Sequence, residues 1–160
     1  MILDLIKYSA KDSVKINKQK NEIFLYNEAV LEYQDMTLNS GVILLNYLDN
    51  EVYAGRIPHP DSAGVLIQKP VFIQGRDEIN PDSIRFNFDT QKALIWNSKS
   101  GQNGMDVFAA LTKKQNDSVY FIKDARVSTA GELIGGNEGE GIDYYFKVRK
   151  GKIIPGGKIV

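Results

Sequence analysis

The amino-acid sequence predicts an all-β fold, a twisted β-jellyroll that is built from repeated hairpins. Apolar and polar residues alternate over stretches of roughly 4 to 8 positions along the whole chain, which is typical of strands, and helical periodicity is almost absent. The alternating stretches are rich in Val, Ile, Phe and Tyr and are separated by Asn, Asp and Gly. Because 160 residues suffice for one sizeable core, we expect a single domain over residues 1–160.

Taken in order, the alternating stretches predict strands along most of the chain. The segment from Met105 to Thr112 is long enough for a short helix, but Val107, Ala109 and Leu111 alternate, and we interpret it as a strand. The expected strands are Ser13–Ile16, Glu22–Tyr26, Ala29–Tyr33, Thr37–Leu45, Glu51–Ala54, Val71–Gln74, Ser83–Phe88, Lys92–Trp96, Asp106–Leu111, Val119–Val127 and Tyr144–Val148.

Polar segments between these stretches predict turns and loops. Turns are expected at Asn17–Asn21 and Asp89–Gln91, where polar residues separate two alternating stretches. Arg56–Gly64 contains two prolines and Gly131–Gly141 is rich in glycine, so both are expected to be surface loops.

A hairpin-sized pattern occurs twice in the sequence. Asp12–Asn17 returns as Asp82–Asn87, and Phe24–Asn27 returns as Leu94–Asn97. A third, shorter copy is expected to begin at Asp117. Each copy reads as a strand, a polar turn and a second strand, which cannot bury its apolar face alone and therefore stacks on its neighbours. Loosely spaced copies favour an open jellyroll over a regular solenoid.

Composition and charge exclude several classes of function. Lys plus Arg equal Asp plus Glu at 20 each, so no strong overall field exists to collect nucleic acid. The chain contains no cysteine, which excludes disulfide scaffolds, thiolate metal sites and cysteine nucleophiles. No run of about 18 apolar residues occurs, so the sequence predicts no membrane-spanning helix.

The residue types that most often carry chemistry do not form a recognisable set. His59 is the only histidine, and without a second His or a Cys it does not complete a zinc site. Glu132, Glu138, Glu140 and Asp143 lie among glycines, but their spacing does not match a calcium-binding loop. The motif Gly-x-Ser-x-Gly is absent. We therefore expect no catalytic residue, no metal and no cofactor.

Alternation also indicates which side chains point inward. Filling a core is the ordinary role of such residues, and as a set they are also able to line a groove. Trp96 has the opposite phase from Ile95 and corresponds to Tyr26 in the repeat, so both aromatic residues are expected on the outer face or at a rim. The expected inward residues are Val14, Ile16, Leu25, Leu31, Tyr33, Leu38, Ile43, Leu45, Ile84, Phe86 and Ile95.

Short segments along the chain share a recognisable order and spacing: Glu28–Gly41, Ile43–Asn46, Asn50–Ala54, Pro70–Phe72, Asp82–Thr90 and Lys150–Val160. They resemble the OstA-like repeat of lipopolysaccharide-transport proteins. In that repeat a small residue, an apolar residue and Tyr alternate before an acidic turn, and the next strand ends near Val-Tyr-Ala. The closer resemblance, over most of the chain from about Leu5 to Val160, is to the N-terminal periplasmic domain of the LptD family in its Bacteroidetes-like form.

The resemblance implies an OstA/LptA-like, V-shaped jellyroll with a partly open apolar interior. Acyl chains gain about 0.8 kcal/mol per CH₂ on leaving water, so such an interior shelters the tails of lipopolysaccharide or lipid A. On this view the inward residues are lipid-groove candidates, and the protein is a non-enzymatic periplasmic module for outer-membrane assembly. The implied partners are other Lpt-type jellyroll domains, docked by edge-strand pairing, and an outer-membrane barrel in the same full-length chain. Nucleic acid is not among them.

A local excess of positive charge lies near the C-terminus. Lys147, Arg149, Lys150 and Lys152 are head-group candidates, because Lys and Arg pair well with phosphate oxygens. The alternative is a solvated strand edge that its lysines protect from aggregation.

Two further functions stay open at this point. One is a structural or adhesive periplasmic or secreted β-domain whose core is closed and binds no lipid. The other is a carbohydrate-active jellyroll enzyme, which requires paired carboxylates that converge in a cleft.

Overall fold

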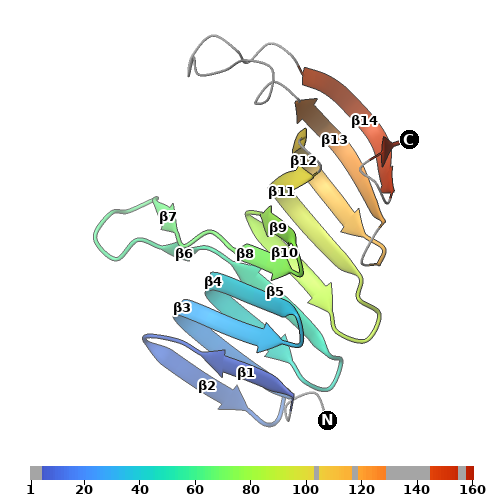
Figure 1. Ribbon diagram of the computed structural model, residues 1–160. Coiled ribbons are helices and arrows are strands. Elements are labelled where there is room, and N and C mark those ends of the chain that lie inside the picture. Colours follow the sequence, from blue (N-terminus) through green and yellow to red (C-terminus); the bar gives the residue numbers. More distant parts are fainter. Residues whose placement is uncertain (1–4, 103–104, 117–118, 129–144, 155–157) are drawn as a thin grey trace.

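The computed structural model describes residues 5–102, 105–116, 119–128, 145–154 and 158–160, and all regular structure in them is strand (Figure 1). The prediction of an all-β jellyroll is confirmed. The strands form one 13-stranded sheet and a separate pair, β6 with β7. Their bounds are β1 (Ile6–Ser9), β2 (Ser13–Asn17), β3 (Glu22–Tyr33), β4 (Met36–Asn46), β5 (Glu51–Gly55), β6 (Ile57–Pro58), β7 (Leu66–Ile67), β8 (Val71–Gln74), β9 (Asp77–Asn80), β10 (Ser83–Asn87), β11 (Ala93–Gln102), β12 (Met105–Lys114), β13 (Tyr120–Ser128), β14 (Tyr145–Ile154) and β15 (Lys158–Ile159).

The large sheet is an antiparallel meander that is folded across its middle. The long strands are β3, β4 and β11 to β14. At three other places in the sheet, two short strands together occupy the position of one long strand: β1 with β2, β5 with β8, and β9 with β10. The first half of β4, Met36–Asn39, pairs with β8, and its second half, Val42–Asn46, pairs with β5. A line therefore crosses the middle of the long strands and separates their halves. We call this line the crease.

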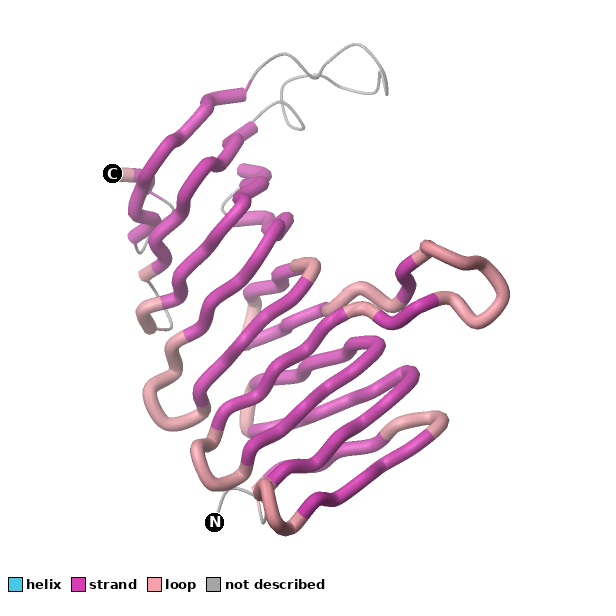
Figure 2. Tube along the Cα trace, turned by 180° about the vertical axis from the view of Figure 1, so that it is seen from behind, coloured by secondary structure: helices cyan, strands magenta, loops and turns pink. Residues whose placement is uncertain are grey.

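The crease divides the sheet into two layers. The first layer contains β2, β5, β10 and the halves of the long strands that pair with them, and the second contains β1, β8, β9 and the other halves. Phe72 of the second layer packs against Phe86 of the first, with 5.4 Å between ring centroids. The two layers therefore face each other, and successive hairpins stack from the N-terminus toward the C-terminus (Figures 1 and 2).

Residues with positive φ mark the crease in several long strands. Asn27 and Glu28 in β3, Asn97 in β11 and Asp124 in β13 have φ between 46° and 71°, and Asn and Asp adopt this left-handed conformation more readily than most residues. In β11 the buried positions pass from 93 and 95 to 98 and 100, so the alternation shifts by one residue at Asn97.

Asparagine side chains shape the turns at the rim of the first layer. Asn17, Asn46 and Asn87 each begin a turn, and in each case Oδ1 accepts the backbone N–H groups two and three residues later at 2.9–3.2 Å. These are Asx turns, in which a side chain replaces a backbone acceptor. The turns expected at Asn17–Asn21 and Asp89–Gln91 are confirmed.

The two long copies of the repeat occupy equivalent places. The backbone N–H of Asp12 donates to Tyr26 O, and that of Asp82 donates to Trp96 O. Tyr26 and Trp96 are both half-buried and alternate with buried inward residues, as the sequence predicted. Val119 instead lies at a rim turn, where its carbonyl accepts the N–H of Gln115. The expected third copy therefore does not occupy an equivalent position.

Every expected strand is present, and β8 coincides with its predicted bounds. The expected strands at 22–26 and 29–33 are the two halves of β3. The sequence did not predict β1, β9, β15 or the pair β6–β7, all of which are short. The expected loop 131–141 and residues 117–118 lie outside the described residues.

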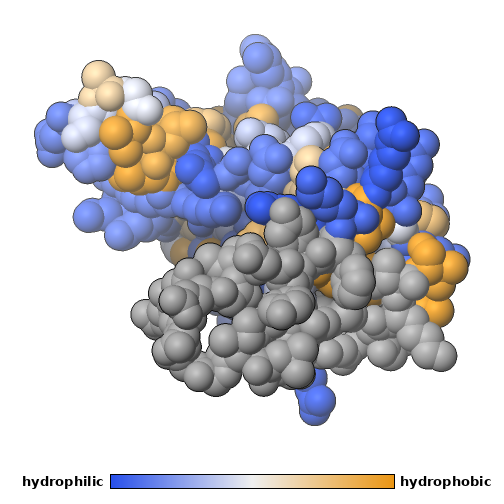
Figure 3. Space-filling model, turned by 90° about the horizontal axis from the view of Figure 1, so that it is seen from above, coloured by the Kyte–Doolittle hydropathy of each residue, from blue (hydrophilic) through white to orange (hydrophobic). Residues whose placement is uncertain are grey.

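Residues 57–67 form a projecting arm that contains β6 and β7 (Figures 2 and 3). This arm replaces part of the loop expected at Arg56–Gly64. Its base is fixed on the crease, because Gln68 bonds to Asn27 and to the backbone N–H of Glu28, at 2.6 and 2.7 Å. Ile57 lies over Gly41, where a Cβ would come within 2.9 Å of the Ile57 backbone nitrogen.

In the described residues, no helix is long and apolar enough to cross a membrane.

Candidate functional site

The inner surface of the folded sheet holds most of the residues that the sequence marked as groove candidates. Eight of them are at most 1% exposed and pack into the core: Leu25, Leu31, Leu38, Ile43, Leu45, Ile84, Phe86 and Ile95. Tyr33 is half-buried against the same core. Their predicted inward orientation is confirmed, and their contact with lipid stays a prediction. Side chains fill the interior from β3 to the first half of β11.

Val14 and Ile16 lie on the inner face but are exposed. Val14 is opposite Leu25 and Ile16 is opposite Ile23, and residues directly opposite in an antiparallel pair project to the same face. Their exposed fractions are 44% and 56%, because β2 is the last strand of its layer in the described chain. The N-terminal end of the interior is therefore open and apolar.

Both layers end in unpaired strand edges at this open end. Among the described residues, β1 and β2 each pair only with β3. At the opposite end β14 pairs with β13, and its last residues continue onward: Ile153 and Ile154 pair with β15, and Lys152 exchanges two backbone hydrogen bonds with Val160. Unpaired edges can accept a strand from another molecule.

Opposite the crease, the rims of the two layers meet through side chains. The rings of Tyr33 and Phe88 lie edge to face, with 5.1 Å between their centroids. Hydrogen bonds of 3.1 and 3.3 Å join Gln74 to Gln91 and Tyr120 to Asp77. No strand pairing joins the layers here in the described residues. The contacts, which we call the seam, are Tyr33 with Phe88, Gln74 with Gln91, and Asp77 with Tyr120.

Polar side chains enter the interior at β11 and β12. Ser98, Ser100, Thr112 and Lys114 are all buried. Lys114 Nζ donates to Gln91 O at 3.0 Å and lies 5.7 Å from the centroid of the Phe86 ring. Strand alternation alone does not identify these positions, because the one-residue shift at the crease places them on the inner face. The shift has a sequence signal, a polar or small residue that interrupts alternation in mid-strand.

The head-group candidates project outward from β14. Lys147, Arg149, Lys150 and Lys152 are all exposed, whereas Ile153 is buried. Lys147 lies opposite Arg126 of β13, which extends the positive charge onto the neighbouring strand.

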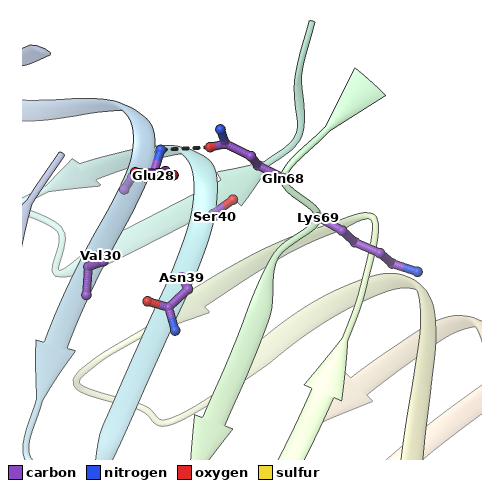
Figure 4. Close-up of a pocket in the computed structure, with 7 residues that line it drawn as sticks. Glu28, Val30, Asn39, Ser40, Gln68 and Lys69 are labelled. Atoms are coloured by element: carbon purple, nitrogen blue, oxygen red, sulfur yellow. Dashed lines mark hydrogen bonds between the residues drawn. The ribbon is translucent and has the colours of Figure 1, made fainter. Parts of the chain in front are cut away.

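A small pocket of about 220 Å³ lies at the crease beside the arm (Figure 4). Gln68 and Lys69 approach it from the segment after the arm, and Asn39 and Ser40 from β4. Gln68 is already bonded to β3, and the Ser40 hydroxyl donates to Gly55 O at 2.7 Å. The side chains of Gln68 and Ser40 are therefore held by hydrogen bonds that belong to the fold.

The described residues contain no group of three or more His, Asp or Glu side chains that could hold a metal ion. His59 lies in the arm, where its Nδ1 accepts the backbone N–H of Asp61 at 3.0 Å. That contact caps a local turn. The glycine-rich segment with Glu132, Glu138, Glu140 and Asp143 lies outside the described residues.

The fold is similar to a solved structure from a lipopolysaccharide-transport system. The crystal structure of LptH from Pseudomonas aeruginosa, described as the LptA homologous periplasmic component of the conserved lipopolysaccharide transport device, matches with a TM-score of 0.59. The match covers 89% of this chain and 93% of that chain at 10% sequence identity. It shows that the fold is LptA-like. No protein-family model and no curated protein sequence matches the chain.

Proposed function

We propose that the protein is a lipopolysaccharide-transport module of the periplasm, of the kind found at the N-terminus of LptD-type assembly proteins. It would shelter acyl chains between its two layers and dock edge to edge with other jellyroll domains. The LptA-like fold supports this proposal. The observation that carries it is the open end, where Val14 and Ile16 leave apolar inner surface uncovered beside two unpaired strand edges.

The seam provides a way for lipid to reach the filled interior. The layers are continuous at the crease, but across the seam only side chains hold them together. Parting them there costs side-chain contacts and breaks no strand ladder. Each CH₂ group that replaces a core contact recovers about 0.8 kcal/mol of transfer free energy. Acyl chains would contact Val14 and Ile16 first and move inward as the seam opens.

A crosslinked seam tests this route, and the absence of native cysteine makes the test clean. The double variant Gln74→Cys/Gln91→Cys is joined by a bismaleimide with a cleavable disulfide spacer. We expect the joined protein to lose binding of lipopolysaccharide, measured by photocrosslinking at position 16, and to regain it on reduction. Position 16 carries the photoreactive residue because Ile16 is the more exposed of the two inner residues.

A matched control joins two residues of the same layer. Asn50 Nδ2 donates to Asp89 Oδ2 at 2.7 Å, and both residues lie at the rim of the first layer. The variant Asn50→Cys/Asp89→Cys, joined in the same way, should bind as well as the unmodified protein. Equal loss in both joined variants would mean that the seam is not the route.

A second candidate function is a structural or adhesive domain with a closed core. The eight fully buried groove candidates favour it, because solvent does not reach them. Lipopolysaccharide that fails to crosslink at position 16 and at positions 31 and 86 of the unjoined protein would select this function over lipid transport.

A further inference from the structure

The outward face of β11 to β14 concentrates positive charge. Eight basic side chains and two acidic ones, Asp106 and Asp124, occupy its charged positions in the described residues. By contrast, β1 to β5 and β8 to β10 together carry three basic and six acidic side chains. We call the first surface the basic face. Its cations are Lys99, Lys113, Lys123, Arg126, Lys147, Arg149, Lys150 and Lys152.

Strand register places like charges directly beside each other on the basic face. Lys123 is the cross-strand partner of Lys150, and Arg126 is the partner of Lys147. Like charges in directly opposite positions destabilise a sheet. Lys123 and Lys150 therefore keep an arrangement that folding alone does not favour, and an external anion would relieve it.

Aromatic rings alternate with these cations. Phe108 lies between Lys99 and Arg126, whose charged groups are 5.5 and 5.6 Å from its ring centroid. Phe121 is 41% exposed, and Lys152 Nζ lies 5.7 Å from its ring. A surface of lysine, arginine and exposed aromatic rings is the composition that binds at the boundary between phospholipid head groups and water.

The basic face is separated from the interior by the sheet itself. Lys123 and Arg126 alternate with the buried Ile122 and Ala125, so they project away from the space between the layers. The phosphates of a lipid whose tails lie inside would therefore miss most of this surface, and the basic face needs a different ligand.

We propose that the basic face docks on the surface of an anionic phospholipid bilayer. Neighbouring strands are about 4.8 Å apart, so the four strands spread their cations over about 15 Å, more than one phosphate group can contact. A bilayer presents many phosphates in one plane and accepts Phe121 at the head-group level. This inference does not depend on lipid transport through the interior.

Vesicle binding by the full chain tests the proposal. The protein is mixed with phosphatidylcholine vesicles that contain or lack phosphatidylglycerol, and its bound fraction is measured by sedimentation at low and high salt. We expect binding only with phosphatidylglycerol and weaker binding at high salt. Trp96, the single tryptophan, lies in the cross-strand row of Leu111, Lys123 and Lys150 and should shift its emission to shorter wavelength on binding.

Two charge-matched double variants locate the contact. Lys123→Gln/Lys150→Gln should weaken vesicle binding about 25-fold, at about fivefold for each lysine near an anionic surface. Lys15→Gln/Lys18→Gln, which removes the same charge from exposed positions near the open end, should leave binding unchanged. A thermal midpoint of the first variant at or above that of wild type shows that any loss is not unfolding.

Three results would overturn the proposal. The first is equal binding to vesicles without phosphatidylglycerol. The second is equal loss in both double variants. The third is binding of a single-stranded oligonucleotide that is tighter than vesicle binding and is lost in Lys123→Gln/Lys150→Gln, which would assign the face to nucleic acid.

Discussion

The part of the molecule from β1 to β10 and the part from β11 to β15 follow one backbone plan with different side chains. In the first part the inner faces carry large apolar residues, such as Phe72, Phe86 and Leu31, that are at most 1% exposed. In β11 and β12 the inner positions include Ser98 and Thr112. The comparison teaches that a creased meander does not need a uniform core.

The outer faces of the two parts differ in the charges that lie opposite each other on neighbouring strands. Arg85 of the first part forms an ion pair with Glu51 at 3.4 Å, and Lys7 lies opposite Glu32. In the second part, Lys123 lies opposite Lys150. The cross-strand pairs named here are therefore oppositely charged in the first part and of like charge in the second.

The largest expected effect compares a buried ring of the first part with an exposed ring of the second. Phe86→Ala should cost about 3–5 kcal/mol of unfolding free energy, because the ring is buried between Phe72 and Phe88 at 5.4 Å from each. Phe121→Ala, at a ring that is 41% exposed on the basic face, should cost less than about 1 kcal/mol. Urea unfolding measures both. Equal costs would mean that the Phe86 ring does not lie in a filled core.

The next effect compares the crease in the two parts. Gly41→Val should cost about 1–3 kcal/mol, because its Cβ would meet the backbone nitrogen and side chain of Ile57 within 3.0 Å. Ala110→Val, at the crease in β12 where the residue is exposed, should change stability by less than about 0.5 kcal/mol. Thermal unfolding of both variants checks this. If Gly41→Val does not lower the thermal midpoint, the base of the arm shifts to accept the larger side chain.

A smaller effect concerns buried hydroxyl groups. Ser40→Ala should cost about 1 kcal/mol, since Gly55 O loses a donor at 2.7 Å. Ser98→Ala with Thr112→Val removes both partners of a 3.4 Å contact and should be nearly neutral. Urea titration separates these outcomes. If the double variant lost more unfolding free energy than Ser40→Ala, the contact between Ser98 and Thr112 would be a strong hydrogen bond.

The smallest effect concerns surface charge and has opposite signs in the two parts. Arg85→Gln should cost about 0.2–1 kcal/mol, because it removes an exposed ion pair with Glu51. Lys150→Gln should stabilise the protein by about 0.5 kcal/mol by removing repulsion from Lys123. Both changes should shrink as salt rises in melting experiments. The same sign for both variants would contradict the difference in charge matching.

Much of the fold was predictable from the sequence because strand alternation is a local signal. Leu25 and Ile43 point inward as expected, and the two copies of the repeat occupy equivalent places. The arm was not predictable, since residues such as Ile57 and Gln68 are held by contacts with Gly41 and Asn27 that are distant in the sequence.

The candidate site was less predictable, for two physical reasons. Whether an inward residue is sealed or open depends on its place in the stack, and so Ile16 is exposed while Leu31 is buried. The basic face was predicted only in part, because the local excess of charge at 147–152 is visible in the sequence whereas composition does not report how the fold places the other cations beside it. Only register brings Lys123 beside Lys150.

The meander order of the sheet has a consequence for how such a chain grows. When each pair of short end-to-end strands is counted as one strand, every strand of the large sheet is hydrogen-bonded to its neighbours in chain order, although single pieces such as β5 and β10 lie far apart in the sequence. A gene duplication that inserts one hairpin adds one step to a linear array and leaves every older pairing intact. The resemblance of residues 12–27 to residues 82–97 fits such a history. The structure can therefore lengthen by whole hairpins during evolution, without changes at either end.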